Sequence, residues 1–223
     1  MSAPLSLIFD LDGTLVDTAP DLLAALNTVL SEAGHRQVHT ADMRHLVGRG
    51  ARQLFEQAFA ETGTVKSAEE LERYTALFLA HYKANLTRQS RPFSGVPETL
   101  MALKRSGALL GVCTNKPHDL TEMLLDQLNM TNYFGSIRGT GLTPYNKPDA
   151  RAVFDVIDAL GGTRDAAVMI GDSPTDVAAA RAAEIPVIAV SFGYTPVPPR
   201  ELGADALIDN FAHLPEALAR ILG

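Results

Sequence analysis

The sequence is poor in several features, and each scarcity excludes a class of protein. Cys113 is the one cysteine among 223 residues, so no disulfide can form within the chain, as fits a reducing compartment. No apolar stretch reaches the roughly 18 residues that a membrane-spanning helix needs. The N-terminal residues carry no basic leader of the kind that begins a signal peptide. We therefore expect a cytoplasmic protein that does not insert into a membrane.

Positive charge is also scarce. The chain has 19 Lys and Arg against 26 Asp and Glu, and its net charge is -7. Because a nucleic-acid backbone is held by a stripe of basic side chains, nucleic-acid binding is not expected. A small substrate that carries phosphate is compatible with this balance, since a few local cations can dominate one pocket.

Hydrophobic residues make up 46% of the chain, enough to bury a sizeable core. Short apolar runs alternate with helical patterns, and this alternation predicts a parallel sheet with helices on both faces. The predicted strands are 5–9, 109–113, 166–170, 186–190 and 206–208. The predicted helices that alternate with them are 98–106, 119–128, 149–160, 174–183 and 214–222.

The segment 18–91 interrupts the alternation, because it shows no convincing strand. Three stretches in it have the pattern of amphipathic helices: 20–33, 46–62 and 68–86. We therefore predict an α/β core with a parallel sheet, residues 1–17 and 92–223, and an inserted all-helical cap, residues 18–91. Ligands bind outside the carboxyl ends of the strands in an open parallel sheet, so a cap inserted after the first strand would lie above the site as a lid.

Acidic side chains follow two of the predicted strands. Asp10 and Asp12 come after the first strand, and Asp172 and Asp176 come after the strand that ends at residue 170. Carboxylates that converge on one sheet edge resist ionising together, and shared protons or a hard cation would relieve their repulsion. Oxygen ligands without His or Cys suit Mg²⁺ better than zinc. The sequence therefore predicts a magnesium site at this edge.

A phosphoryl group would complete such a site. Its transition state requires positive charge and hydrogen-bond donors around the equatorial oxygens. Lys147 is the candidate cation, and Thr114 and Asn115, which follow the second strand, are the candidate donors. Asp10 can attack phosphorus to form an aspartyl-phosphate. Asp12 can protonate the leaving oxygen and afterwards deprotonate water.

Four motifs resemble those of the haloacid dehalogenase superfamily and occur in the same order. They are Asp10-Leu-Asp-Gly-Thr-Leu-Val-Asp17-Thr18, Thr114-Asn-Lys, Lys147-Pro148 and Gly171-Asp172-Ser-Pro-Thr-Asp176. Three further stretches are similar to the bacterial phosphoglycolate phosphatases within that superfamily: Val47-Gly-Arg-Gly-Ala51, Phe93-Ser-Gly-Val-Pro-Glu-Thr-Leu and Phe192-Gly-Tyr. The resemblance spans essentially the whole chain, and it implies a Rossmann-like catalytic core, residues 1–17 and 92–223, with a mobile cap, residues 18–91.

The resemblance implies a magnesium-dependent phosphatase that hydrolyses a small phosphate monoester, 2-phosphoglycolate above all. In this family pattern Asp10 would be the nucleophile and Asp12 the acid and base. Thr114 would be a phosphate ligand, and Lys147 would neutralise charge. Dehalogenase members lack an acid two residues after the nucleophile, so Asp12 points to phosphoryl chemistry.

The resemblance also implies the metal ligands and one substrate contact. Mg²⁺ would be held by Asp10, by the backbone carbonyl of Asp12 and by Asp172, with Asp176 behind them. Arg49, in the loop that is similar to the cap loop of phosphoglycolate phosphatases, would bind the substrate by pairing with its carboxylate.

Simpler structural readings compete with these assignments. Asp172 and Asp176 could serve as an N-cap and a first-turn acid, because Ser173-Pro174 suits a helix start. Lys147 could be an ordinary surface lysine, and Arg49 could lie in a plain turn between helices.

Other functions compete as well. The same fold could be a sugar-phosphate phosphatase, a pyrophosphatase or a phosphomutase, and a mutase needs a cap that keeps water out. A signalling receiver domain also carries a phosphorylatable aspartate, but Asp12 and the long insertion argue against it. The sequence leaves the oligomeric state open between a monomer and a homodimer.

Overall fold

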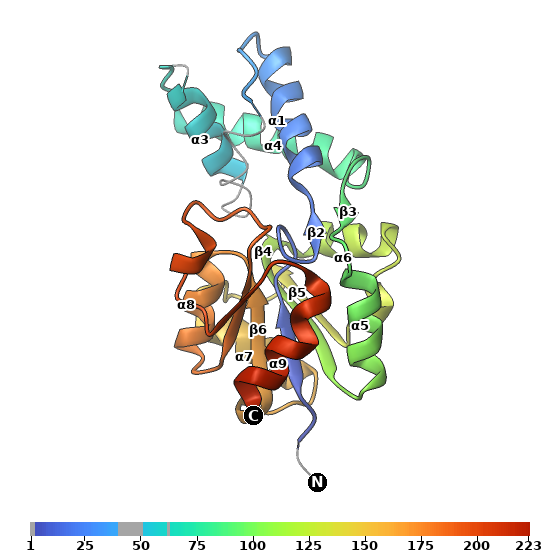
Figure 1. The fold of residues 1–223 in the computed structure, drawn as a ribbon. Helices are drawn as coiled ribbons and strands as arrows, with labels where there is room; N and C mark the ends of the chain where they lie inside the picture. The colour runs from blue at the N-terminus through green and yellow to red at the C-terminus, as the bar shows by residue number, and fades with distance from the viewer. Residues whose placement is uncertain (1–2, 40–50, 62) are drawn as a thin grey trace.

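The computed structural model describes residues 3–39, 51–61 and 63–223. Figure 1 shows a sheet flanked by helices, and a separate group of helices beyond one end of the sheet. This group contains α1 (Ala19–Glu32), α3 (Ala51–Glu61) and α4 (Ala68–Ala84). It is inserted after the first strand, so the predicted α/β fold with a helical insertion is confirmed.

The central sheet has six strands, and every pair of neighbours is parallel. Its spatial order is β5 (Ser136–Thr140), β4 (Leu109–Pro117), β1 (Ser6–Phe9), β6 (Ala167–Gly171), β7 (Val187–Val190) and β8 (Ala206–Ile208). Phe9 at the end of β1 lies opposite Val112 of β4 and Ile170 of β6. The three strands that were expected to carry polar ends are therefore adjacent at the centre of the sheet.

Successive side chains of β1 enter different hydrophobic layers, as the alternation of a strand requires. Leu7 and Phe9 belong to one buried cluster, and Ile8 belongs to the other. The first layer contains α5 (Val96–Arg105), α6 (His118–Gln127) and α9 (Leu214–Leu222), and the second contains α7 (Ala150–Ala159) and α8 (Pro174–Ala182). Because both faces of β1 are covered, its sequence is a continuous apolar run rather than an alternating one.

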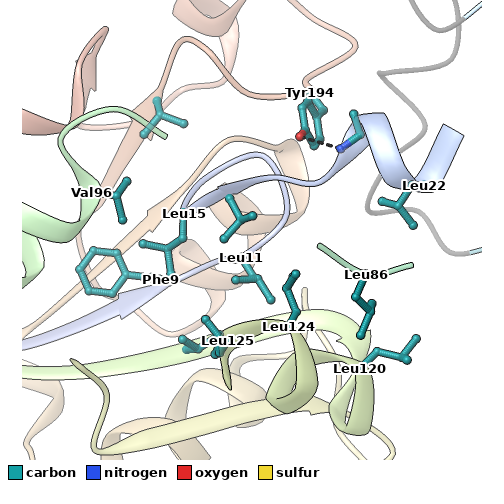
Figure 2. Packing of buried hydrophobic residues seen from close by; sticks show 14 of the residues in the cluster. Phe9, Leu11, Leu15, Leu22, Leu86, Val96, Leu120, Leu124, Leu125 and Tyr194 are labelled. Atoms are coloured by element: carbon teal, nitrogen blue, oxygen red, sulfur yellow. Dashed lines mark hydrogen bonds between the residues drawn. The ribbon is translucent and has the colours of Figure 1, made fainter. Parts of the chain in front are cut away.

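The first layer continues past the end of β1 toward the helical insertion. Figure 2 shows Phe9, Leu11 and Leu15 packed between Val96 of α5 and the leucines of α6. All three side chains are fully buried. The hydrophobic core therefore anchors the loop that carries the first acidic motif.

The chain enters and leaves the helical insertion through a small antiparallel ribbon of β2 (Val16–Asp17) and β3 (Arg91–Pro92). Next to this ribbon, the buried carboxylate of Asp21 on α1 accepts hydrogen bonds from the backbone N–H groups of Gln89 and Ser90 and from Ser90 Oγ. The outgoing and returning segments are therefore held together.

Most predicted elements are confirmed within a few residues, and two differ. The strand expected over 109–113 continues to Pro117, and β5 was not expected at all. The prediction that 18–91 holds no strand is wrong at Arg91, which begins β3. Residues 46–50 of the predicted helix 46–62 lie outside the described residues. None of the helices that the structure describes has both the length and the apolar character needed to cross a membrane.

Candidate active site

A cavity of about 600 Å³ opens at the carboxyl ends of the central strands. Six of the residues expected at the site line it: Asp10, Asp12, Thr114, Asn115, Lys147 and Asp172. Thr114 is buried in β4. Arg49, the expected contact to a substrate carboxylate, lies outside the described residues. The parallel topology thus collects side chains that are far apart in the sequence.

The first motif bends tightly beneath Asp172. The backbone N–H of Asp10 donates to the carbonyl of Ile170 at 2.9 Å, which ties the end of β1 to β6. Gly13 has a φ of 84°, and a Cβ at this position would lie 2.5 Å from Asp172 Oδ2. Glycine is therefore required both for the turn and for the close approach of the carboxylate. Thr14 Oγ1 donates to Asp172 Oδ1 at 3.2 Å and fixes its orientation.

Three carboxylates form a cluster at the base of the cavity. One oxygen each from Asp10, Asp172 and Asp176 lies within 4.8 Å of the others. Burial raises the pKa of Asp10 to about 6; Lys147 opposes the rise, and Asp176 and Asp12 add to it. The pKa of Asp172 is likewise raised well above its usual range by burial, then by Asp176 and Asp10. Such a group lacks positive charge, and its oxygen-only donors fit a divalent metal ion.

Asp176 already has partners for both of its oxygens. Its Oδ1 accepts from Lys147 Nζ at 2.6 Å, and its Oδ2 accepts from Ser173 Oγ at 2.6 Å and from two backbone N–H groups. Asp176 and Ser173 also form the capping box at the start of α8. Asp176 therefore has both proposed places: it caps the start of α8, and it lies beside the acidic cluster.

Lys147 is a buried cation with two acidic partners. Its Nζ lies 2.8 Å from Asp10 Oδ1 and 2.6 Å from Asp176 Oδ1. Burial alone would lower the pKa of this ammonium, but the charges of Asp10 and Asp176 outweigh it and hold the pKa above its usual value. The reading of Lys147 as a surface lysine is therefore wrong.

Asn115 holds the backbone of the Lys147 loop. Its Nδ2 donates to the carbonyl of Lys147 at 2.9 Å, whereas its Oδ1 is buried and has no hydrogen-bond partner among the residues that the structure describes. Asn115 is one of the residues that line the cavity. A contact between Asn115 and substrate stays a prediction.

The side chain of Asp12 stands apart from the acidic cluster and faces the helical insertion. Its two carboxylate oxygens lie 3.2 and 3.3 Å from Lys116 Nζ, and the same ammonium donates to Tyr82 OH at 2.8 Å. All three side chains are buried. Sequence reasoning missed Lys116, although it stands two residues after Thr114, the spacing that places two strand residues on one face.

Tyr194 links the acidic cluster to the start of the helical insertion and was also missed. Its backbone N–H donates to Asp172 Oδ2 at 2.6 Å. Its hydroxyl donates to Asp17 Oδ1 at 2.5 Å and accepts from the backbone N–H of Ala19 at 3.0 Å, the bond drawn in Figure 2. The sequence does contain the stretch Phe192-Gly-Tyr, which is similar to relatives. That similarity does not indicate which residues Tyr194 contacts.

Comparison with known proteins agrees with this arrangement. Residues 7–190 match the family of haloacid dehalogenase-like hydrolases. The chain is 45% identical over 219 residues to the phosphoglycolate phosphatase of Agrobacterium fabrum, with 97% of this chain and 94% of that protein covered. It is 45% identical over 217 residues to the phosphoglycolate phosphatase of Caulobacter vibrioides, with 97% and 92% covered.

Among solved structures, the chain resembles the crystal structure of a predicted phosphoglycolate phosphatase from Haemophilus somnus 129pt. The TM-score is 0.90 at 28% identity, and the match covers 98% of this chain and 99% of that one. The likeness therefore extends over the sheet and the inserted helices alike.

Proposed function

The chain belongs to the haloacid dehalogenase-like hydrolase family, and we propose that it hydrolyses 2-phosphoglycolate with Mg²⁺ through an aspartyl-phosphate on Asp10. The observation that carries the proposal is the buried cluster of Asp10, Asp172 and Asp176 around a single lysine, Lys147, at the base of the cavity. Such a cluster is short of positive charge and faces the space where a phosphoryl group would lie. Two relatives that match along nearly the whole chain are phosphoglycolate phosphatases, which supports the choice of substrate.

Each residue has a part in the proposed reaction. Asp10 attacks phosphorus as the bond to the leaving oxygen breaks, and Asp12 gives its proton to that oxygen. Lys147, held between Asp10 and Asp176, stabilises negative charge on the equatorial oxygens, with Thr114 as a donor. Asp12 then takes a proton from water, which attacks the aspartyl-phosphate and releases phosphate.

The metal would be held by Asp10, Asp172 and the backbone carbonyl of Asp12. When bound, Mg²⁺ supplies positive charge to the transferring phosphoryl group. Asp176 serves behind these ligands by orienting Lys147 and capping α8, since both of its oxygens have partners.

A phosphate-release assay on a panel of substrates tests the proposal. The panel contains 2-phosphoglycolate, ethyl phosphate, glucose 6-phosphate and pyrophosphate, each with Mg²⁺ and again after EDTA treatment and dialysis. We expect the highest kcat/KM on 2-phosphoglycolate, one phosphate released for each substrate consumed, and no turnover without metal until Mg²⁺ is restored.

Each rival function predicts a different result. Preference for glucose 6-phosphate or pyrophosphate would replace the proposed substrate, and loss of a sugar phosphate without phosphate release would indicate a mutase. A phosphorylated protein that persists for minutes would indicate a receiver domain.

Location and assembly complete the proposal. A cytoplasmic location is consistent with a chain whose single cysteine, Cys113, is buried. The chain acts as a monomer or a homodimer, and light scattering coupled to size-exclusion chromatography distinguishes these two states.

A further inference from the structure

Two lysines are the only cations among the described residues that line the cavity, and their surroundings differ. Lys147 has two carboxylate partners, Asp10 and Asp176, within 2.8 Å. Lys116 has one, Asp12, and its nearest polar contact is the hydroxyl of Tyr82 on α4. The proposed reaction employs the charge of Lys147 and leaves the charge of Lys116 without a task.

Lys116 is held in place as a buried cation. Its Nζ lies 2.8 Å from Tyr82 OH and 4.6 Å from the centroid of the same ring, and its side chain is 3% exposed. Burial alone would lower its pKa, but Asp12 and Tyr82 outweigh this and hold the pKa above its usual value. Burial also raises the pKa of Tyr82 to about 12, so its hydroxyl stays neutral. A buried ammonium held in this way needs an anion beside it.

The distance between Lys116 and Asp12 restricts which anionic group of a substrate can bind the ammonium of Lys116. An acid that protonates a leaving oxygen must approach it to roughly 2.6–3.2 Å. Lys116 Nζ lies 3.2 Å from the carboxylate of Asp12. An anionic group carried on the carbon next to the leaving oxygen therefore comes within reach of the same ammonium. In phosphoglycolate, that carbon carries the carboxylate.

We propose that Lys116 is the specificity-determining residue that binds the carboxylate of the substrate, with Tyr82 as the residue that positions its ammonium. The inference rests on the proposed function. Without substrate, Asp12 is the anion beside Lys116 Nζ. The substrate carboxylate takes this position on binding, and Asp12, freed from the ammonium, takes up a proton from water and turns toward the leaving oxygen as the acid.

Arg52 is another cation near Lys116 and Tyr82 in the described part of the chain, and it is less suited to binding the substrate carboxylate. It lines an adjoining cavity that also borders Lys116 and Tyr82. Its side chain is 52% exposed and pairs with Glu56 one helical turn away. A half-exposed guanidinium that already has an acid partner discriminates less between ligands than a buried ammonium does.

Two substrates that differ only in the carboxylate test the inference. The assay compares kcat/KM for 2-phosphoglycolate and ethyl phosphate, in which a methyl group replaces the carboxylate. Because a charge-assisted hydrogen bond is lost, Lys116→Met should lower kcat/KM for 2-phosphoglycolate about 30- to 100-fold more than for ethyl phosphate. Tyr82→Phe should shift the same ratio by about 5-fold, since the ammonium remains but loses one contact.

Lys83→Met is the matched control. Lys83 lies on α4 beside Tyr82, and its Nζ pairs with Asp119 Oδ2 at 2.9 Å, so it too joins the insertion to the sheet part. Both partners are exposed, and neither lines the cavity. The ratio between the two substrates should stay within about 2-fold of wild type, as for an exposed ion pair.

A binding measurement gives a readout that does not depend on turnover. Isothermal titration of the Mg²⁺-loaded protein compares 3-phosphonopropionate, in which CH₂ replaces the bridging oxygen of phosphoglycolate, with propylphosphonate, which lacks the carboxylate. Wild type should prefer 3-phosphonopropionate, Lys116→Met should lose that preference, and Lys116→Arg should keep part of it. The arginine and Tyr82 variants keep the inference testable if Lys116→Met does not fold.

The outcomes separate this inference from the proposed function. Wild type with no preference for 2-phosphoglycolate over ethyl phosphate overturns both. Wild type with that preference, and Lys116→Met with equal losses on both substrates, overturns only the inference and leaves Lys116 as a residue that positions Asp12. The inference is also overturned if Arg49→Met removes the preference and Lys116→Met retains it.

Discussion

Acids outnumber lysine in one charged group of the cavity, at the sheet edge, whereas a second group, which meets the helical insertion, pairs one acid with one lysine. The sheet-edge group consists of Asp10, Asp172 and Lys147, from strand ends and loops, and of Asp176, from the first turn of α8. The cap-side pair is Asp12 with Lys116, and Tyr82 joins it from α4.

The difference separates two tasks. The sheet-edge group has three carboxylates and one lysine, so it is short of positive charge and can accept a metal ion, which suits reaction chemistry. The cap-side pair is balanced and can exchange one anion for another, which suits the selection of a substrate. Changes in the first should abolish turnover, and changes in the second should alter the preference among substrates.

The largest expected effect is that of Asp10→Asn. The amide cannot form the aspartyl-phosphate, so kcat should fall by about 10⁴-fold or more on every substrate. Phosphate release and circular dichroism together measure turnover and folding. The control is Asp158→Asn, an exposed position on α7. Near-native turnover in the Asp10 variant would falsify the assignment of the nucleophile.

A second prediction concerns the stability of the metal-free protein. The pKa of Asp10 is raised to about 6 in the folded state. Between pH 6 and 4 the folded protein therefore holds a proton that the unfolded chain does not, and stability rises as pH falls through this window. At pH 7, Asp10→Asn should be more stable than wild type by about 2 kcal/mol, and the gap should close near pH 4.

Urea unfolding in EDTA at several pH values measures this gap. Mg²⁺ should reverse the sign at pH 7, because it stabilises the folded wild type that binds it. A gap that is independent of pH would show that burial and the acidic neighbours do not raise the pKa of Asp10, and it would weaken the contrast between the two groups.

The smallest expected effect is that of Tyr194→Phe, which tests a residue that contacts both the cluster and the insertion. The hydroxyl that bonds Asp17 and Ala19 is lost, so the free energy of unfolding should fall by about 1 kcal/mol. The backbone N–H still donates to Asp172, so kcat should change less than about 3-fold. Urea unfolding and steady-state rates, with Tyr133→Phe alongside, measure both. A large fall in kcat at unchanged stability would place the hydroxyl in the reaction.

The sheet-edge group was largely predictable from the sequence for a physical reason. A parallel strand buried on both faces is a continuous apolar run, so the acid that ends it marks the edge of the sheet. The runs before Asp10 and Asp172 show this plainly, and parallel order then brings their ends together. The strand β5 was missed because Ser136–Thr140 lies at the sheet border and contains Ser, Arg, Gly and Thr instead of an apolar run.

The cap-side pair was harder to predict, because its contacts depend on tertiary packing. Lys116 meets Asp12 only because β4 pairs with β1, and Tyr82 reaches Lys116 only because α4 folds over that strand end. No local periodicity encodes either approach. Tyr194 is a similar case, since two of its hydrogen bonds join the loop after β7 to Asp17 and Ala19 and the third joins it to Asp172.

The ribbon of β2 and β3 has a consequence for protein engineering. Asp17 and Arg91 are paired across two antiparallel strands, so the ends of the helical insertion meet at one place on the sheet part. Any donor segment whose termini come together in the same way can be transplanted there as a cassette. Chimeras of this kind exchange Tyr82 of α4 with the rest of the insertion and leave Asp10, Asp12 and Lys116 in place, which offers a modular route to altered preferences.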